Sequence, residues 1–403
     1  MNPLIIAIAL ITSQFFYAPF PYFYDFVPLM LLLILVLLKF KPIPIFILIS
    51  LLYFIIIILL QWVRYPEYAF DFFKNILPIF RWPLYFLLFG YLFKNISKAT
   101  SITNFKILTS SLVVYGVCLN FIALLDANYY ISFLNFIFNE SYSVKSWSSI
   151  TGVPTSVSSA SAMQGRFSSG FLQPVASGQF YGTVTFLTYV LFSRNLISKK
   201  YFFLIMSGSI FSGYISDSAV MYFFMLPIFL YIIISKLNIN YFIIIIISAI
   251  FSGALLIIIT YDDFVVFFHY ITSGRYASDG NAMNAISNVY KNISLSDILF
   301  GFSFKEYGYF GKGLDGDSGY IIKIVHIGVI GTIYYYYLVV NTLFYIFNSL
   351  SIEKDFRLSV ILPILVYYFL IEFGTNAYSL PQVTLILASF IFLTMKSNIK
   401  SYV

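Results

Sequence analysis

Two aspartates stand directly before a long apolar run in the last quarter of the chain. Asp315 and Asp317 lie in the stretch GLDGDSG (313–319), and YIIKIVHIGVIGTIYYYY follows it. A carboxylate within hydrogen-bond reach of a hydroxyl group can remove its proton, so Asp317 is a candidate general base. The alternative is structural, because aspartate is also a common helix N-cap. For Asp315 we expect a solvated turn position with a secondary role at the site.

Two arginines have neighbours that favour contact with a ligand. Arg166 lies in GRFSSG and Arg275 lies in SGRYASDG, so a glycine precedes each of them. Glycine lets the backbone approach a ligand closely, and a guanidinium group binds phosphate through two parallel hydrogen bonds. We therefore predict that Arg166 and Arg275 bind phosphate. Arg81 is a further candidate, and the alternative for each arginine is snorkelling to lipid headgroups or pairing with an acid.

Three more charged residues, Asp217, Lys323 and Glu372, lie close to or within apolar stretches. A charge at membrane depth is costly, and such a residue is by default a candidate for function. We expect Asp217 and Glu372 near the outer ends of helices. Lys323 should lie one turn inside its helix, where it pairs with one of these acids or touches a lipid phosphate.

The composition indicates the elements that must position these residues. The 403 residues are 60% hydrophobic and 10% charged, whereas soluble domains carry about 25% charged residues. Long continuous apolar runs favour membrane helices and exclude the alternating pattern of a barrel. We predict an all-α polytopic membrane protein, with residues 1–403 as a single transmembrane domain.

About twelve spans are expected. Residues 4–18 lack a basic start and a clear cleavage site, so we expect them to be a retained first span rather than a removed signal peptide. The predicted spans are 4–18, 27–39, 43–61, 77–93, 105–125, 174–193, 201–215, 218–235, 241–260, 319–346, 358–374 and 380–396.

The distribution of Lys and Arg predicts the topology. With the N-terminus inside, the inside segments hold most of the cations and only two acids, Glu353 and Asp355. Both termini are then cytoplasmic, and two large loops, 126–173 and 261–318, lie outside. Loops longer than a connection requires often carry function. The net charge of +7 reflects this topology, and we expect no nucleic-acid partner.

Neither a metal nor another cofactor is expected. The chain has one cysteine, Cys118, and no zinc-binding pattern. Residues 315–317 read DGD, similar to the metal–nucleotide site of many cytosolic glycosyltransferases. The predicted topology argues against that use, because it places this stretch outside, whereas nucleotide sugars are made and consumed inside the cell.

The outer loops resemble a known family. Each long loop carries a Gly-Arg, and the second is followed by an acid and a helix with spaced glycines, as in the O-antigen polymerase (Wzy) family of the O-antigen polymerase/ligase superfamily. The stretch GRFSSGFLQPVASGQF is similar to the family's Arg-x-x-Gly segment. The stretch ILFGFSF is similar to its Leu-x-Gly-x-Gly segment, with Phe302 and Ser303 in place of the second glycine.

This resemblance implies a glycosyltransferase of the bacterial inner membrane. It would polymerise undecaprenyl-pyrophosphate-linked repeat units into O-antigen or a related surface polysaccharide on the outer face, by inverting transfer without a metal. Arg166 and Arg275 would hold the pyrophosphate, and Asp317 would act on the acceptor hydroxyl. A flippase and a chain-length regulator of the same pathway would be partners.

Two alternatives remain open. An O-antigen ligase of the same superfamily carries a histidine where this chain has Asp317, and His326 does not match that place. A lipid-linked oligosaccharide flippase also has about twelve spans, but it usually shows internal repeats, short loops and charges inside the bundle. Two loops of about 50 residues and no visible repeat favour the polymerase.

Overall fold

The computed structural model describes the greater part of the chain. Every described residue lies in a helix, a turn or an irregular connection, and no strand occurs among them. The described residues are 30, 34, 43–64, 72–138, 161–162, 165–171, 174–218, 221, 223–236, 295–301, 319–349, 354–372 and 381–397.

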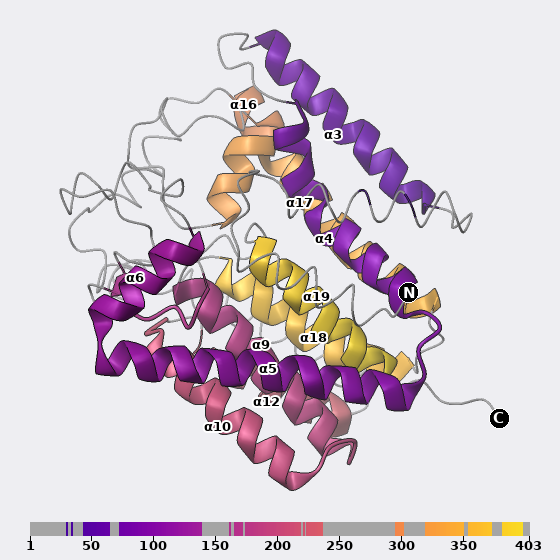
Figure 1. The fold of residues 1–403 in the computed structure, drawn as a ribbon. Helices are drawn as coiled ribbons and strands as arrows, with labels where there is room; N and C mark the ends of the chain where they lie inside the picture. The colour runs from indigo at the N-terminus through magenta and orange to yellow at the C-terminus, as the bar shows by residue number, and fades with distance from the viewer. Residues whose placement is uncertain are drawn as a thin grey trace, which may run out of the picture.

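The described helices form a bundle (Figure 1). In chain order they are α3 (Ile45–Arg64), α4 (Phe72–Phe93), α5 (Lys98–Leu125), α6 (Ala127–Phe138), α9 (Pro174–Ser193), α10 (Lys199–Ile215), α12 (Met225–Lys236), α16 (Leu295–Phe300), α17 (Gly319–Ser349), α18 (Lys354–Ile371) and α19 (Pro381–Lys396).

The helical fold class is confirmed for this part of the chain. Three described helical segments, Ile45–Arg64, Lys98–Leu125 and Ile327–Asn348, are long and apolar enough to cross a membrane, and three shorter apolar helices accompany them. The predicted spans 4–18, 27–39 and 241–260 lie outside the described residues, apart from residues 30 and 34. Each of the other predicted spans overlaps a described helix, but the number of twelve stays a prediction.

The predicted span 218–235 is wrong at its start. The helix α12 begins only at Met225. Before it, Asp217 has a left-handed backbone (φ 43°), Met221 is helical and its N–H donates to Ser218 O at 3.0 Å, and a turn at residues 223–224 follows. Pro227 lies in the first turn of α12, where proline is tolerated because no N–H donor is needed there.

The helix α6 lies in a region predicted only as loop. Asp126 ends α5, and its carboxylate accepts hydrogen bonds from the backbone N–H groups of Asn128 (3.0 Å) and Tyr129 (3.1 Å). An aspartate in this position is an N-cap. The chain therefore turns at Asp126, and α6 packs back against α5 (Figure 1).

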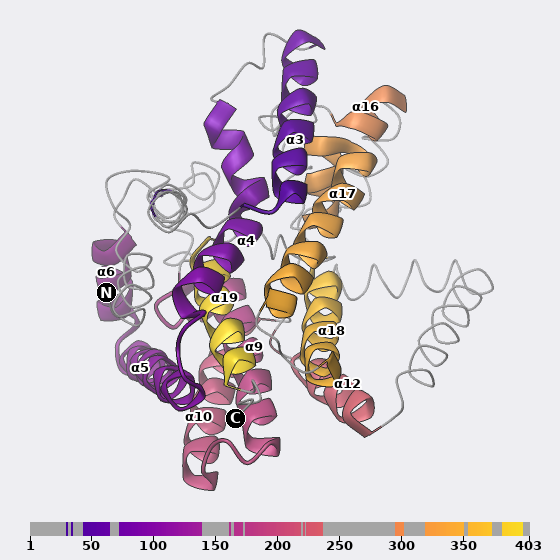
Figure 2. The same ribbon diagram turned by 90° about the vertical axis from the view of Figure 1, so that its right-hand side faces the viewer.

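The centre of the bundle is aromatic and aliphatic. The helix α19 packs against α4, α5 and α9, while α17 packs against α4 and α18 packs against α12. Figure 2 shows α12 and α18 on one side of the bundle and α5 and α6 on the opposite side. The fully buried aromatic side chains that fill this core include Trp82, Phe86, Phe89, Tyr181, Tyr367 and Tyr368.

Two cations predicted for the cytoplasmic side lie together at one end of the bundle. Lys396 Nζ donates to the backbone carbonyl of Lys94 at 2.6 Å. These residues end α19 and follow α4, respectively. The structure thus places the two helix ends on the same side, as the topology prediction requires.

Candidate functional site

The helix α17 is broken at Gly328. This residue has φ 71° and ψ 174°, which are not helical values, so the prediction of one continuous span over 319–346 is wrong. A Cβ at Gly328 would overlap the carbonyl of Leu299 and the backbone nitrogen of Gly301. The backbone at Gly328 is therefore in close contact with the end of α16. At Gly331 an added Cβ would instead meet Ile327 of the same helix.

The break positions Lys323. In a straight helix, residues twelve positions apart are separated by about 18 Å along the axis. Here the Lys323 ammonium lies 5.4 Å from the ring centroid of Tyr335 and 5.7 Å from that of Tyr336. Lys323 also forms an ion pair with Glu372, at the end of α18. The predicted pairing of Lys323 with one of the acids is therefore confirmed.

Arg81 joins this group from α4. Only 5% of its surface is exposed. The charges of Arg81 and Glu372 both act on the hydroxyl group of Tyr335, and α4 and α17 are in contact. Three of the predicted site residues, Arg81, Lys323 and Glu372, thus lie within electrostatic range of one buried tyrosine. Two cations next to a single carboxylate can hold an anion.

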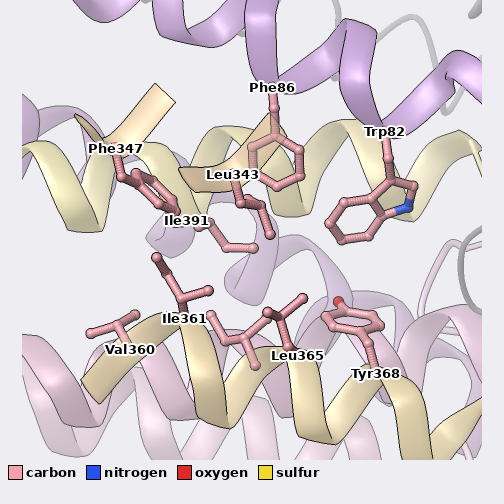
Figure 3. Close-up of a pocket in the computed structure, with 10 residues that line it drawn as sticks. Trp82, Phe86, Leu343, Phe347, Val360, Ile361, Leu365, Tyr368 and Ile391 are labelled. Atoms are coloured by element: carbon pink, nitrogen blue, oxygen red, sulfur yellow. The ribbon is translucent and has the colours of Figure 1, made fainter. Parts of the chain in front are cut away.

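An apolar pocket borders this charged cluster. Its ten lining residues come from α4, α17, α18 and α19, and Trp82 and Tyr368 form one end of it (Figure 3). Trp82 follows Arg81 in the chain, and Glu372 N donates to the carbonyl of Tyr368 at 3.1 Å. The pocket therefore runs away from the charged cluster into the bundle. Its free volume of about 10 Å³ is roughly that of one water molecule, so the apolar core is nearly closed here.

Arg166 lies in a separate, sharply bent segment, residues 165–171. Gly165, Ser169 and Gly170 all have positive φ values (77°, 51° and 83°). Arg166 N donates to the carbonyl of Ser161 at 3.0 Å, and Phe167 N donates to the carbonyl of Ile215 at 3.3 Å. The guanidinium Nε of Arg166 is buried and has no hydrogen-bond partner. This leaves a charged donor for a ligand.

Buried polar side chains hold this segment in place. Asn120 Nδ2 donates to Ser169 Oγ at 2.8 Å, and Ser169 Oγ donates to Asn120 Oδ1 at 3.1 Å. Ser177 of α9 donates to the same hydroxyl at 3.3 Å. The hydroxyl groups of Tyr130 and Ser168 lie 3.2 Å apart, and burial raises the pKa of Tyr130, so its phenol stays neutral.

Asp217 lies close to the Arg166 segment in the fold. Its N–H donates to the carbonyl of Tyr214 at 2.9 Å, at the end of α10, where Ile215 accepts from Phe167. The next residue, Ser218, packs against α9, where a Cβ at Gly178 would lie 2.9 Å from the Ser218 hydroxyl. The first half of α9 therefore runs past this second group of predicted residues.

The remaining predicted site residues, Arg275, Asp315 and Asp317, lie outside the described residues. Within the described part of the chain, no group of three His, Cys, Asp or Glu side chains could hold a metal ion.

Sequence reasoning missed Tyr335 and Gln179. Tyr335 belongs to the YYYY run, which reads as aromatic belt or core because tyrosines in succession face all sides of a helix. Gln179 is a single amide within the apolar helix α9, and a polar residue at membrane depth was the signal that could have found it.

No protein-family model matches this chain, and no match is found among curated proteins or solved structures. The resemblance to the O-antigen polymerase family therefore stays a prediction from the residues themselves.

Proposed function

We propose that this chain is a polymerase of undecaprenyl-pyrophosphate-linked oligosaccharide repeat units. It would build O-antigen or a related surface polysaccharide on the outer face of the bacterial inner membrane. The main support is the buried charged cluster, in which two cations, Arg81 and Lys323, accompany the single carboxylate of Glu372. A pyrophosphate group is an anion that such a cation excess can bind.

The proposed reaction is an inverting glycosyl transfer. The hydroxyl oxygen of the acceptor sugar attacks the anomeric carbon of the donor glycan and forms the new C–O bond. The bond from that carbon to pyrophosphate breaks, and its electron pair leaves with the lipid pyrophosphate. The hydroxyl proton passes to a carboxylate, for which we propose Asp317. Arg166 and Arg275, together with Arg81 and Lys323, bind lipid pyrophosphate, and these cations stabilise the growing charge of the leaving group.

The first test is the surface polysaccharide of a strain that lacks this protein. A single repeat unit attached to the lipid core is the expected product, because flipping and ligation continue while polymerisation stops. A gel of the polysaccharide separates this product from long chains and from bare core. Long chains of normal length in the deletion strain would contradict the proposal.

The second test uses point variants in the same strain. Arg166→Ala and Arg275→Ala should abolish elongation, and an immunoblot of membranes should show unchanged protein. Arg64→Ala is the matched control, because Arg64 is an exposed arginine whose Nη2 donates to Ser296 Oγ at 3.0 Å. If Arg275→Ala elongates normally at native protein levels, the assignment of Arg275 to pyrophosphate is wrong.

A flippase is the second candidate, favoured by one observation. The Lys323–Glu372 pair lies inside the helical bundle, and buried charges between helices are typical of transporters. For a flippase the deletion strain would show no repeat unit on the core, and lipid-linked units would accumulate on the cytoplasmic face. For a ligase the core would also stay bare, but the lipid-linked units would accumulate on the outer face.

A further inference from the structure

Gln179 of α9 is a buried amide whose hydrogen-bonding groups are unused. Its side chain is 0% exposed, and neither Nε2 nor Oε1 has a hydrogen-bond partner. Buried polar groups in proteins are nearly always paired, so an unpaired amide of this kind calls for a ligand, a water or a functional reason. Substituting an apolar side chain would remove the cost of leaving it unpaired.

The contacts of α9 with α18 indicate where Gln179 points. Thr183 Oγ1 lies 3.1 Å from the hydroxyl of Tyr368. A Cβ at Gly182 would lie 2.8 Å from the hydroxyl of Tyr367. Gln179 precedes Gly182 and Thr183 by three and four residues, so it lies on the same face of α9, one turn earlier. This face looks toward α18.

One helical turn beyond Tyr368, at the end of α18, lies Glu372. Glu372 follows Tyr368 by four residues, and its N–H donates to the carbonyl of Tyr368. Gln179 lies one turn before Thr183 on α9, and Glu372 lies one turn after Tyr368 at the end of α18. The two residues therefore lie at the same level along the bundle axis. Lys323 reaches this level too, because it pairs with Glu372, and it keeps 11% of its side-chain surface exposed.

The chemistry of a primary amide limits the classes of ligand that can bind to Gln179. Nε2 donates hydrogen bonds, and Oε1 accepts them. A phosphate offers mainly hydrogen-bond acceptors, which would leave Oε1 without a donor. A metal ion offers no hydrogen-bond acceptor, which would leave Nε2 without a partner. Sugar hydroxyl groups both donate and accept. The amide also carries no charge, which distinguishes it from the neighbouring Lys323 and Glu372.

We infer that Gln179 binds hydroxyl groups of the sugar part of the lipid-linked substrate, at the level of the charged cluster formed by Arg81, Lys323 and Glu372. This inference rests on the proposed polymerase function. Gln179 therefore serves as a specificity-determining residue for the glycan, while the cations serve the pyrophosphate.

The test is the variant Gln179→Met, which keeps the length of the side chain and removes both hydrogen-bonding groups. Purified full-length protein in lipid nanodiscs is given lipid-linked repeat units, and elongation is measured against their concentration. The concentration for half-maximal rate should rise about tenfold, as the loss of two neutral hydrogen bonds predicts. Binding of undecaprenyl pyrophosphate without sugar should be unchanged, and the Tm should be unchanged or higher.

The control is Thr188→Val on the same helix. Thr188 is also fully buried, and its hydroxyl lacks a hydrogen-bond partner, but it lies nine residues further along, toward the other end of the bundle. It should elongate like the wild type. Equal elongation by Gln179→Met would overturn the inference while the polymerase function stands. A lower Tm together with lost undecaprenyl pyrophosphate binding would assign Gln179 a structural role and would also overturn it. Failure of the wild type itself to elongate would instead reject the proposed function.

Discussion

Lys323, in the first segment of α17, forms an ion pair with Glu372 at the end of α18. The two residues are 49 positions apart in the chain, and the pair joins the start of α17 to the end of α18. Glu372 is fully buried, so its charge depends on Lys323 for compensation. The ion pair therefore fixes the segment before the Gly328 break against the rest of the bundle.

Removing one partner of this pair should destabilise the protein strongly. In Lys323→Met the carboxylate of Glu372 loses its ammonium partner within the bundle, and the expected loss in the free energy of unfolding is about 3–5 kcal/mol. The double variant Lys323→Met/Glu372→Leu should regain most of this loss, because neither charge remains. Denaturant unfolding of the purified proteins in detergent measures both. Equal stability of Lys323→Met and the wild type would show that the pair contributes nothing to stability.

The break at Gly328 should not tolerate a side chain. The backbone of Gly328 (φ 71°, ψ 174°) lies in a region that essentially only glycine adopts and costs an alanine roughly 1–3 kcal/mol. The overlap with the Leu299 carbonyl adds to this cost. Gly328→Ala should lower the Tm and also the elongation activity, because Lys323 loses its place. Gly90→Ala is the control. Gly90 lies in the helix α4, where an added Cβ would meet only side chains, those of Ile346 at 3.3 Å and Phe392 at 3.6 Å. If Gly328→Ala matches Gly90→Ala in Tm, the break is not needed for stability.

The pairing of Lys323 with Glu372 was predictable because burying a charged side chain among apolar residues costs free energy. Lys323 stands within a run of Ile and Val, and Glu372 follows an apolar stretch. A charged residue there needs a partner, and this argument predicted their pairing without a structure. The described helices were predictable for a related reason, since long apolar runs have few other stable arrangements in lipid.

Other features depend on contacts that no local pattern shows. The break in α17 is set by the backbone of Leu299 and Gly301, which lies against Gly328 although it is distant in sequence. The bend at residues 165–171 depends on hydrogen bonds from Asn120 of α5. The level shared by Gln179 and Glu372 follows from the pairing of two helices, and a single sequence does not show which helices are neighbours.

The bent segment that carries Arg166 should loosen when Asn120 is replaced. Asn120→Leu keeps the volume but removes the partner of the Ser169 hydroxyl, at an expected cost of about 1–3 kcal/mol. Asn104→Leu is the matched control, because Asn104 lies on the same helix and its side-chain nitrogen has no hydrogen-bond partner. It should be neutral or slightly stabilising. Thermal unfolding compares the two variants, and a larger loss in Asn104→Leu would contradict the role given to Asn120.

Arg166→Lys separates charge from geometry at the proposed pyrophosphate site. Lysine keeps the positive charge but lacks the planar fork that binds two phosphate oxygens together. The loss of one hydrogen bond to a charged group should lower the elongation rate about 10–100-fold. Membrane levels should stay normal, because the backbone N–H of Arg166, not its side chain, donates to Ser161. Arg64→Lys is the control and should elongate normally. Normal elongation by Arg166→Lys would show that a single positive charge is sufficient, and normal elongation by Arg166→Gln as well would exclude a phosphate contact at this position.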